Sequence, residues 1–562
     1  MTNERWKAIC HGSPIGWHPV AGACLAALGC TVPAWGMQIE TDIPDLKLTW
    51  DTTVKYSNAF RVKERSSALV ANPQFDDGDR NFGTGLISNR FDILTEFDLR
   101  YQRFGARLSG AAWYDSVYTR HNDNDSAGLF GPGTSSANQS ASTSSYDVFT
   151  PATRELMGHK AEVLDAFVFG SFDLGDMPGN FRLGRHSVLY GESLFMGANG
   201  IARAQAPIDV IKATAVPDTQ FKELIRPVPQ VSGTLQVSDA VSLGAYYQFR
   251  WEGDRIPAVG SYFSFADNSG AGAERLLPGA LLPPAGAPQQ PDQRPRNSGQ
   301  EGMQLRLRAG EADIGFYAVR FHSKNFDQYT YLNAPPMVFP TGYRLTYAEG
   351  IKAFGASISQ TFGDVNLAAE VSTRRNAPFV SIVGLFPDAA AIADNSGNAR
   401  YAVGNSAHAQ GSMIWQVPKT FLFNEATMAA EVAWNRALEV TRNPEAVDPN
   451  SKRDAWGLRT VLTPVYRQVF DGTDLELPVG LGYNPKGASR VVPLFNAPAS
   501  DKGGDLSVGV NANYLDRWRF GLDYTHYFGA AGTFLNSTST ARTFKQVYAD
   551  RDFVSFTART SF

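Results

Sequence analysis

The chain has 562 residues, a formal net charge of −4 at pH 7 and an aromatic content of 12%. Its 51 lysine and arginine residues are balanced by 55 aspartate and glutamate residues, so it has no basic surface of the kind that binds nucleic acid, and we expect no nucleic-acid partner. It contains only 3 cysteines, which excludes a disulfide-rich domain.

Residues 1–36 have the pattern of a cleaved export signal. Arg5 and Lys7 precede an apolar run of small residues, Val20–Val32, and Ala34-Trp35-Gly36 supplies the small residues that a signal peptidase requires before its cut. The apolar run is too short to cross a bilayer as a helix. We therefore expect the mature protein to begin at Met37 as a single domain, residues 37–562.

All three cysteines, Cys10, Cys24 and Cys30, lie in the part that we expect to be removed. A lipoprotein anchored at Cys30 is the less favoured alternative, because Leu28 is not at the usual position three residues before the cysteine. A mature chain without cysteine offers neither a thiolate nucleophile nor a zinc–cysteine site. We predict no cofactor.

After Met37, apolar and polar residues alternate in runs that are typical of β-strands. The clearest run places Phe91, Ile93 and Phe97 on one face and charged residues on the other. Only Gln102 and Arg103 separate it from the next run, which begins at Phe104.

Connections farther along the chain alternate between short turns and long segments rich in glycine, serine and proline. The long segments run over residues 119–159, 253–302, 323–350, 375–406, 437–454, 485–504 and 529–550. Outer-membrane barrels have this asymmetry, with short periplasmic turns and long extracellular loops. The sequence therefore predicts an all-β fold, a transmembrane antiparallel β-barrel of about 18 strands (16–18).

The last run, residues 551–562, alternates in the same way and ends in Phe562. A terminal phenylalanine closing such a strand resembles the signal by which bacterial outer-membrane proteins are recognised for insertion. We expect Phe562 to address the chain to the barrel-assembly machinery, and the protein to lie in the outer membrane of a Gram-negative bacterium, against lipid and lipopolysaccharide. The alternative for this segment alone is the edge strand of a soluble sandwich.

If the apolar faces meet lipid, the opposite faces line the interior, and these faces are charged. We predict the following lumen-lining residues: Arg90, Glu96, Arg100, Arg306, Arg308, Glu370 and Arg519. So many charges in a dry core would carry a large desolvation cost, which indicates a hydrated lumen. The alternative is that they form structural ion pairs between neighbouring strands and select nothing.

One long connection, residues 189–228, differs from the others because it is rich in apolar residues such as Ile201, Ile208 and Val216. Exposed at the cell surface, these side chains would favour aggregation. We predict that the segment, which follows the fifth strand, folds into the barrel as a constriction or plug, as in general porins. Capping the barrel mouth or holding a subunit contact are the alternatives.

Charged residues in and beside this segment are candidates for the constriction and the substrate path. They are Arg182, Arg185, Glu192, Arg203, Lys222, Glu223, Arg250 and Glu252. We expect a short bridge between an arginine and a carboxylate to hold the start of the segment against the wall.

Metal and catalytic sites are not predicted. Clustered carboxylates and a glycine that permits a turn in Asp76-Asp77-Gly78-Asp79 could hold Ca²⁺, which is the less favoured alternative. The cluster is shorter than an EF-hand loop and lacks its distal glutamate, and Asx turns around Gly78 explain it better. Ser193 follows Gly191-Glu192, but Phe195 stands where a nucleophile elbow requires glycine. His526 shares a face with aromatic residues, which favours a place at the membrane boundary over the role of a catalytic base.

Several motifs together resemble a proteobacterial outer-membrane family known as domain of unknown function 1302. They are Phe75-Asp-Asp-Gly-Asp-Arg-Asn-Phe82, Phe181-Arg-Leu-Gly-Arg185, Tyr190-Gly-Glu-Ser193, Phe249-Arg-Trp-Glu252 and Val259-Gly-Ser-Tyr-Phe263. Tyr190 departs from the tryptophan that the family tends to have before Gly-Glu. The resemblance implies a barrel partnered with periplasmic machinery that exports or takes up hydrophobic compounds, and it names no substrate.

The leading functional hypothesis is a channel for a small hydrophobic or amphiphilic solute, narrowed by residues 189–228, with a periplasmic transport partner. Two alternatives from other classes are an outer-membrane enzyme that hydrolyses lipids or esters, and a surface adhesin that uses the long loops. We predict that the protein is not an enzyme, because no nucleophile, base and orienting group can be assembled from the sequence.

Overall fold

The computed structural model describes residues 37–125, 147–276, 286–332, 340–387, 393–496 and 500–562. The predicted export signal, residues 1–36, lies outside these ranges. So does the middle of the long connection predicted between Thr119 and His159.

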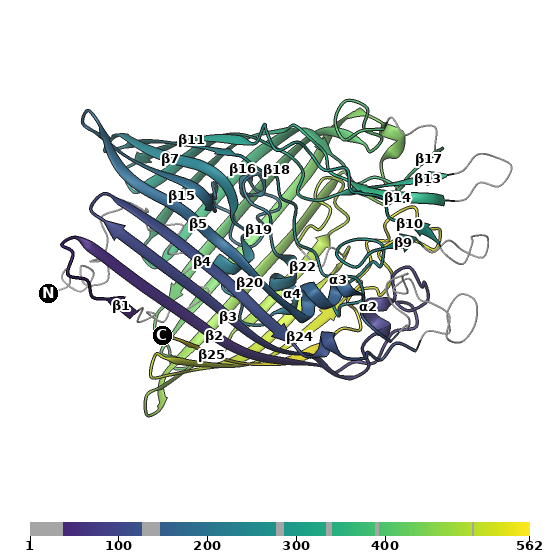
Figure 1. The fold of residues 1–562 in the computed structure, drawn as a ribbon, viewed down its shortest axis with the longest axis horizontal. Coiled ribbons are helices and arrows are strands. Elements are labelled where there is room, and N and C mark those ends of the chain that lie inside the picture. Colours follow the sequence, from purple (N-terminus) through teal and green to yellow (C-terminus); the bar gives the residue numbers. More distant parts are fainter. Residues whose placement is uncertain (1–36, 126–146, 277–285, 333–339, 388–392, 497–499) are drawn as a thin grey trace.

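Eighteen antiparallel strands form one closed barrel (Figure 1). In chain order the wall consists of β2 (Leu46–Arg61), β3 (Gly85–Tyr101), β4 (Phe104–Asp115), β5 (His159–Leu174), β6 (Met177–His186), β7 (Val228–Ser238), β8 (Val241–Gln248), β11 (Glu301–Ala309), β12 (Ala312–Phe321), β15 (Ile351–Phe362), β16 (Val365–Pro378), β18 (Val403–Val417), β19 (Glu425–Arg442), β20 (Asp454–Phe470), β21 (Thr473–Glu476) with β22 (Val479–Lys486), β23 (Gly503–Tyr514), β24 (Trp518–Phe528) and β25 (Phe553–Ser561). β21 and β22 are two halves of one wall strand, since both pair with β20 and β23. The predicted fold class and strand number are confirmed.

The barrel closes where the first wall strand meets the last. β2 pairs with β25 from Thr53–Ser561 to Arg61–Phe553. The backbones of Thr52 and Phe562 then exchange hydrogen bonds of 2.7 and 3.0 Å. A short strand, β1 (Met37–Ile39), adds to β2 beside this seam. Because the ring is complete, the wall has no open strand edge, which lipid would not tolerate.

Side-chain exposure alternates along the wall as the sequence predicts. On β3, Phe91 and Ile93 are 43% and 38% exposed, whereas Arg90 is 4% exposed. On β25, Phe556 points outward, while Ser555 and Thr557 are buried. The apolar faces therefore form the lipid-facing surface and the polar faces line the interior.

The two ends of the barrel differ in their connections (Figure 1). Both ends of the described chain lie at the end with short turns, which is the periplasmic end of such a barrel. The long loops at the other end carry two small sheets. These are β9 (Arg275–Leu276) with β10 (Ala287–Pro288), and β13 (Asp327–Leu332) with β14 (Pro340–Thr346) and β17 (Gly384–Pro387).

The helices of the described residues are short, and none is long and apolar enough to cross a bilayer. They are α2 (Asp77–Arg80), α3 (Pro151–Thr153), α4 (Val210–Ala215) and α5 (Phe221–Leu224), with the single turns η1 (Val117–Thr119), η2 (Arg154–Gly158), η3 (Ile201–Ala204) and η5 (Pro444–Ala446).

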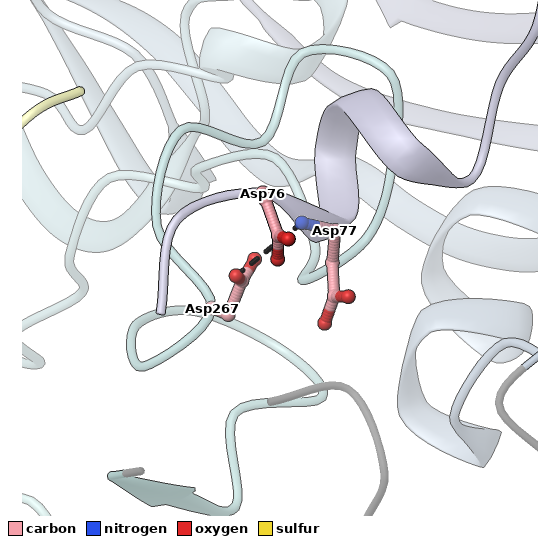
Figure 2. A group of neighbouring side chains, drawn as sticks. All are labelled: Asp76, Asp77 and Asp267. Carbon is pink, nitrogen blue, oxygen red and sulfur yellow. Dashed lines mark hydrogen bonds between the residues drawn. The ribbon is translucent and has the colours of Figure 1, made fainter. Parts of the chain in front are cut away.

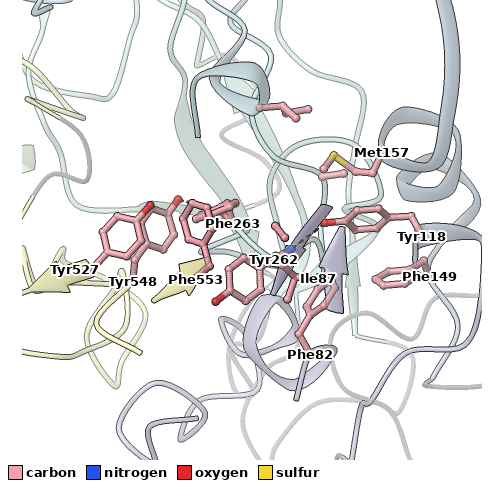
Figure 3. Packing of buried hydrophobic residues seen from close by; sticks show 13 residues of the cluster. Phe82, Ile87, Tyr118, Phe149, Met157, Tyr262, Phe263, Tyr527, Tyr548 and Phe553 are labelled. Atoms are coloured by element: carbon pink, nitrogen blue, oxygen red, sulfur yellow. Dashed lines mark hydrogen bonds between the residues drawn. The ribbon is translucent and has the colours of Figure 1, made fainter. Parts of the chain in front are cut away.

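An aromatic cluster joins several extracellular loops (Figure 3). Phe82, Tyr118 and Phe149 come from the loops after β2 and β4, while Tyr262 comes from the loop after β8. Phe82 and Tyr262 pack edge to face, with ring centroids 5.4 Å apart. These loops therefore share one hydrophobic core, which we call the extracellular cap.

The sequence predicts the long segment to begin at residue 253, which implies a strand up to Glu252, but the structure ends this strand earlier. β8 ends at Gln248, because the chain then turns away from the wall. Trp251 folds inward, where its indole N–H donates to the Ser323 carbonyl oxygen at 3.1 Å. This correction moves Arg250 and Glu252 from the wall into an extracellular loop.

Candidate transport path

The connection between β6 and β7 folds into the barrel, as the sequence predicts, and we call residues 187–227 the inward segment. Two of its short helices begin at capping residues. Asp209 caps α4 by accepting a hydrogen bond from the Lys212 backbone N–H, and Gln220 with Glu223 forms a capping box at α5. An isolated bridge between Ile208 and Ile225 brings the two ends of this helical part together.

Two buried glutamates of the wall hold the first half of the inward segment. Glu370 on β16 accepts hydrogen bonds from the backbone N–H groups of Glu192 at 2.9 Å and Ile201 at 2.7 Å. Glu431 on β19 accepts three, from Leu194, Phe195 and Met196, at 3.1, 2.6 and 2.7 Å. Hydrogen bonds to a charged acceptor are the strong ones, so these contacts fix the backbone of the segment against the wall.

A buried arginine of the wall also holds the first half of the inward segment, by donating hydrogen bonds to backbone carbonyl oxygens. The Arg374 guanidinium on β16 donates to the carbonyl oxygens of Ala198, Asn199 and Gly200 at 2.9, 3.0 and 2.9 Å. The Asn199 side chain also lies within 3.2 Å of both His408 and Asn435. The turn at residues 198–200 therefore has both backbone and side-chain partners on the wall.

The second half of the inward segment is held by ion pairs. Arg203 forms a bidentate pair with Asp254, at 3.0 and 2.8 Å. Arg255 pairs with Asp209 at 2.9 Å and also with Glu162 on β5. These contacts hold the helical part against the β5 side of the barrel and the loop after β8.

Contacts with the strands beside the β2–β25 seam hold the C-terminal part of the inward segment. Lys222 pairs with Glu96 on β3. Asp218 lies 2.9 Å from Arg559 on β25 and 3.7 Å from Arg519 on β24. The segment is thus attached to both sides of the barrel.

Glu252 joins the two ends of the inward segment. It pairs with Arg185, at the end of β6, at 2.8 Å and with Arg226, just before β7, at 3.4 Å. A second bridge joins Glu192 to Arg306 on β11 at 3.0 Å. These contacts are the kind of bridge expected from the sequence, although Glu252 belongs to a loop rather than to the wall.

Most of the other predicted residues lie in the lumen, but away from one another. Arg90 pairs with Asp92 at 2.8 Å, and Glu223 pairs with Lys212 at 3.3 Å. Arg182 lies over the Phe167 ring and Arg100 over the Phe169 ring, at 5.5 and 5.9 Å.

Arg308, predicted to line the lumen, and Arg250, predicted for the constriction or substrate path, both lie away from the inward segment. Arg308 is exposed on β11, one residue before the periplasmic turn. Arg250 is exposed at the extracellular end, because β8 stops two residues earlier.

A cavity of about 750 Å³ lies between the inward segment and the wall. Its lining on the wall side comes largely from β20, β23 and β24, and includes Arg459, Val461, Thr463, Val465, Ser507, Asn511, Arg519, Asp523 and Thr525. The inward segment contributes Phe195, Met196, Ile208, Val210, Lys212, Val216 and Asp218, among others.

This cavity extends over most of the height of the wall. Val491 and Asn496, which line it, lie in the extracellular loop between β22 and β23. Asn511 and Arg519, which also line it, lie close to the periplasmic turn between β23 and β24. The cavity therefore runs alongside the inward segment, from the extracellular loops toward the periplasmic turns.

Charges along this path are mostly paired. Arg459 pairs with Asp505 and Arg519 with Glu476, at 2.6 and 2.9 Å. Asp523 is an exception, since among the described residues no cationic group lies within ion-pairing distance of it. At the extracellular side, burial lowers the pKa of Lys324 to about 7.

Sequence reasoning did not identify Glu431, whose carboxylate holds three backbone groups of the segment. A signal for it does exist in the sequence. Glu431 shares the inner face of β19 with Ala429, Ala433 and Ala437, which are all buried. Small residues on one wall face allow another backbone to approach closely, and a lone carboxylate among them is then a docking point.

The residues considered for catalysis do not meet. The Ser193 hydroxyl accepts a hydrogen bond from the Gln410 side chain in the lumen. His526 lies on β24, where its Nδ1 is 2.6 Å from the Asp552 carboxylate. Ser193 and His526 therefore form no catalytic pair.

A family model described as "Protein of unknown function (DUF1302)" matches residues 17–562, and no curated protein matches the chain. The solved structures that are similar include OccAB3 of Acinetobacter baumannii, with 9% identity, a TM-score of 0.43 and coverage of 92% of this chain and 100% of that one. The channel DcaP of the same organism has 11% identity, a TM-score of 0.35 and coverage of 93% and 99%.

OmpF of Salmonella typhi, solved in complex with daunomycin, has 9% identity, a TM-score of 0.35 and coverage of 94% of this chain and 100% of that one. The match to the family model extends over nearly the whole chain, including every strand of the barrel. The chain therefore belongs to the family described as protein of unknown function DUF1302.

Proposed function

We propose that the protein is an outer-membrane channel for a small hydrophobic or amphiphilic solute and that the inward segment narrows its lumen. The observation that carries the proposal is the continuous cavity of about 750 Å³ beside a segment held by wall carboxylates. A barrel of this size would otherwise leave an open aqueous hole.

The composition of the path supports a solute that is partly apolar. Phe195, Met196, Val210 and Val216 line the cavity, together with wall residues such as Val461. Paired charges such as Arg459 with Asp505 lie among these apolar side chains. A solute that keeps some polar contacts while its apolar part is transiently desolvated suits such a path, because transit requires binding that is weak enough to reverse.

Single-channel recording in a planar bilayer tests the proposal. The comparison is between the refolded mature protein and a variant in which residues 201–221 are replaced by a short Gly/Ser linker. We expect small or rare conductance steps for the wild type and large stepwise conductance for the variant. If neither protein conducts, the lumen is not a path and the channel assignment fails.

The surroundings of the channel belong to the same proposal. Removal of residues 1–36, recognition of Phe562 by the barrel-assembly machinery, a place in the Gram-negative outer membrane among lipid and lipopolysaccharide, and transfer of the solute to a periplasmic partner fit an exported barrel. N-terminal sequencing of protein recovered from outer-membrane fractions tests the first and third of these, with Met37 as the expected first residue.

A further inference from the structure

Three buried carboxylates converge in the extracellular cap, away from the transport path (Figure 2). Asp76 and Asp77 lie at the start of α2 in the first loop, and Asp267 lies in the loop after β8. One oxygen from each side chain lies within 4.8 Å of the other two, and the residues are 1%, 0% and 1% exposed. The first loop and the loop after β8 thus bring their acidic groups to one buried point.

Asp267 is not part of the acidic run in the first loop. It approaches from a loop 190 residues away, and its Oδ1 has no hydrogen-bond partner in the part of the chain that the structure describes. Oδ1 of Asp76 has none there either, although Oδ2 of Asp76 pairs with Arg80. Buried carboxylate oxygens without donors are strongly unfavourable unless a proton or a cation joins them.

Nearby arginines do not compensate for Asp267, because they are engaged elsewhere. Arg61 pairs with Asp79 at 3.0 Å and with Asp550 at 3.2 Å. Arg551 pairs with Asp79 at 3.4 Å. Within the described residues, no cationic group lies within ion-pairing distance of Asp267.

Close packing at Gly78 sets the geometry. A Cβ atom at this position would lie 2.3 Å from the Ser264 carbonyl oxygen and 2.9 Å from that of Ser261. Only glycine therefore allows the loop of residues 261–267 to press against the start of α2. This contact places Asp267 beside Asp76 and Asp77.

We propose that Asp76, Asp77 and Asp267 bind a divalent cation, and that the ion is Ca²⁺. The donors are all carboxylate oxygens, which hard cations prefer. Ca²⁺–oxygen distances of about 2.3–2.6 Å place opposite ligands about 5 Å apart, which accommodates oxygens spread over as much as 4.8 Å. Mg²⁺, with distances of about 2.1 Å, demands near-ideal octahedral geometry and usually keeps several waters, which suits a buried site made of three carboxylates less well.

The bound ion would join the first loop to the loop after β8. Both loops also contribute to the aromatic cluster of the cap, through Phe82 and Tyr262. Burial raises the pKa of Asp76 to about 6 and that of Asp267 well above its usual range, so protons compete with the ion for the site. The role is structural and does not depend on which solute the channel carries.

The test uses the purified mature barrel in detergent, first treated with a chelator. Calcium binding is measured by titration calorimetry, and thermal unfolding is followed with and without 1 mM Ca²⁺ or Mg²⁺. The variant is Asp267→Asn, and the control is Asp239→Asn in an exposed periplasmic turn. Heat-dependent migration on gels shows that each protein is folded.

We expect the wild type and the control to bind one Ca²⁺ per chain with a Kd below about 1 mM, and to unfold at a higher temperature when calcium is present. Asp267→Asn should bind at least about tenfold more weakly and lose this thermal shift. With chelator, however, it should be no less stable than the wild type, because one buried charge is gone.

The proposal is overturned if the wild type binds no divalent cation, or if Ca²⁺ shifts the unfolding of wild type and Asp267→Asn equally. A shift with Mg²⁺ but not with Ca²⁺ would overturn the choice of ion. Should Asp267→Asn fail to fold, titration of the wild type and of Asp76→Asn decides the matter.

Discussion

Glu431 on the barrel wall accepts a hydrogen bond of 2.7 Å from the backbone N–H of Met196, a residue 235 positions earlier in the chain. The same carboxylate holds the N–H groups of Leu194 and Phe195. One buried side chain thus fixes three consecutive residues that line the cavity or adjoin it. The shape of the cavity depends on this attachment as well as on the side chains that line it.

Replacing Glu431 with glutamine should loosen the inward segment. The neutral amide keeps one weaker acceptor and turns a donor toward N–H groups, so the attachment should lose about 1.5–3 kcal/mol. Single-channel recordings should then show larger and noisier currents than the wild type. Glu439→Gln is the control, because Glu439 is exposed on the same strand. Currents that match the wild type would contradict the docking role of Glu431.

Replacing Glu252 with glutamine should release both ends of the segment, since Arg185 and Arg226 would lose their shared carboxylate. Trypsin should cut after Lys222 several-fold faster than in the wild type, because cleavage requires local opening. Mass spectrometry of timed digests measures this. Equal rates in the two proteins would show that the remaining contacts hold the segment without Glu252.

Asp523 should contribute to ion selectivity, because it lines the cavity and, among the residues that the structure describes, no cationic group lies within ion-pairing distance of it. In Asp523→Asn, reversal potentials measured across a salt gradient should shift toward anions, while Asp471→Asn in an exposed periplasmic turn should behave like the wild type. An unchanged reversal potential would mean that ions do not pass Asp523.

Lys324 should make the conductance depend on pH near neutrality. It lines the path and donates to Gln300 at 3.0 Å, and burial lowers its pKa to about 7. Arg203, Asp254 and Glu252 are the charged groups whose fields act on it.

Below pH 7 the Lys324 ammonium is charged, so cation conductance should fall as the pH is lowered from 8 to 6. In Lys324→Gln this part of the pH dependence should disappear. A variant that retains the full wild-type dependence would place the titrating group elsewhere.

The carboxylates Asp76, Asp77 and Asp267 should make stability fall with rising pH, whereas an ordinary salt-bridged aspartate makes stability rise with pH. The pKa of Asp76 is about 6 in the folded protein, above the ordinary value near 3.8, so folding favours the protonated form. With chelator present, the melting temperature should therefore fall as the pH rises from about 4 to above 6. Calcium should prevent this fall in melting temperature at pH 7. A melting temperature that does not change with pH, either with chelator or with calcium, would contradict the prediction.

The sequence predicts the barrel because its signal is local. Alternation at Phe91 and Ile93, short turns such as Gln102–Arg103 and the terminal Phe562 can each be recognised within a few residues. The apolar inward segment is also visible in the composition around Ile201 and Ile208. These features need no knowledge of which strands are neighbours.

The partners across the lumen could not be predicted, because they depend on register around the whole ring. The contact of Glu431 with Met196 and that of Asp267 with Asp77 join residues 235 and 190 positions apart. Arg250 was misplaced for a local reason, since an alternating pattern does not reveal that Trp251 turns inward and ends the strand. The sequence around Asp76 and Asp77 likewise does not show that Asp267 supplies a third carboxylate.

The seam between β2 and β25 also constrains how the protein can be made. Thr53 and Ser561 share a hydrogen bond across 508 positions of sequence, so the ring can only be completed after the last residues have been synthesised and exported. Until then, the edge of β2 has no partner, and the chain must be kept from pairing with other unfolded chains. Loss of a few residues at the carboxyl end would therefore impair assembly far more than a deletion of the same length in an extracellular loop.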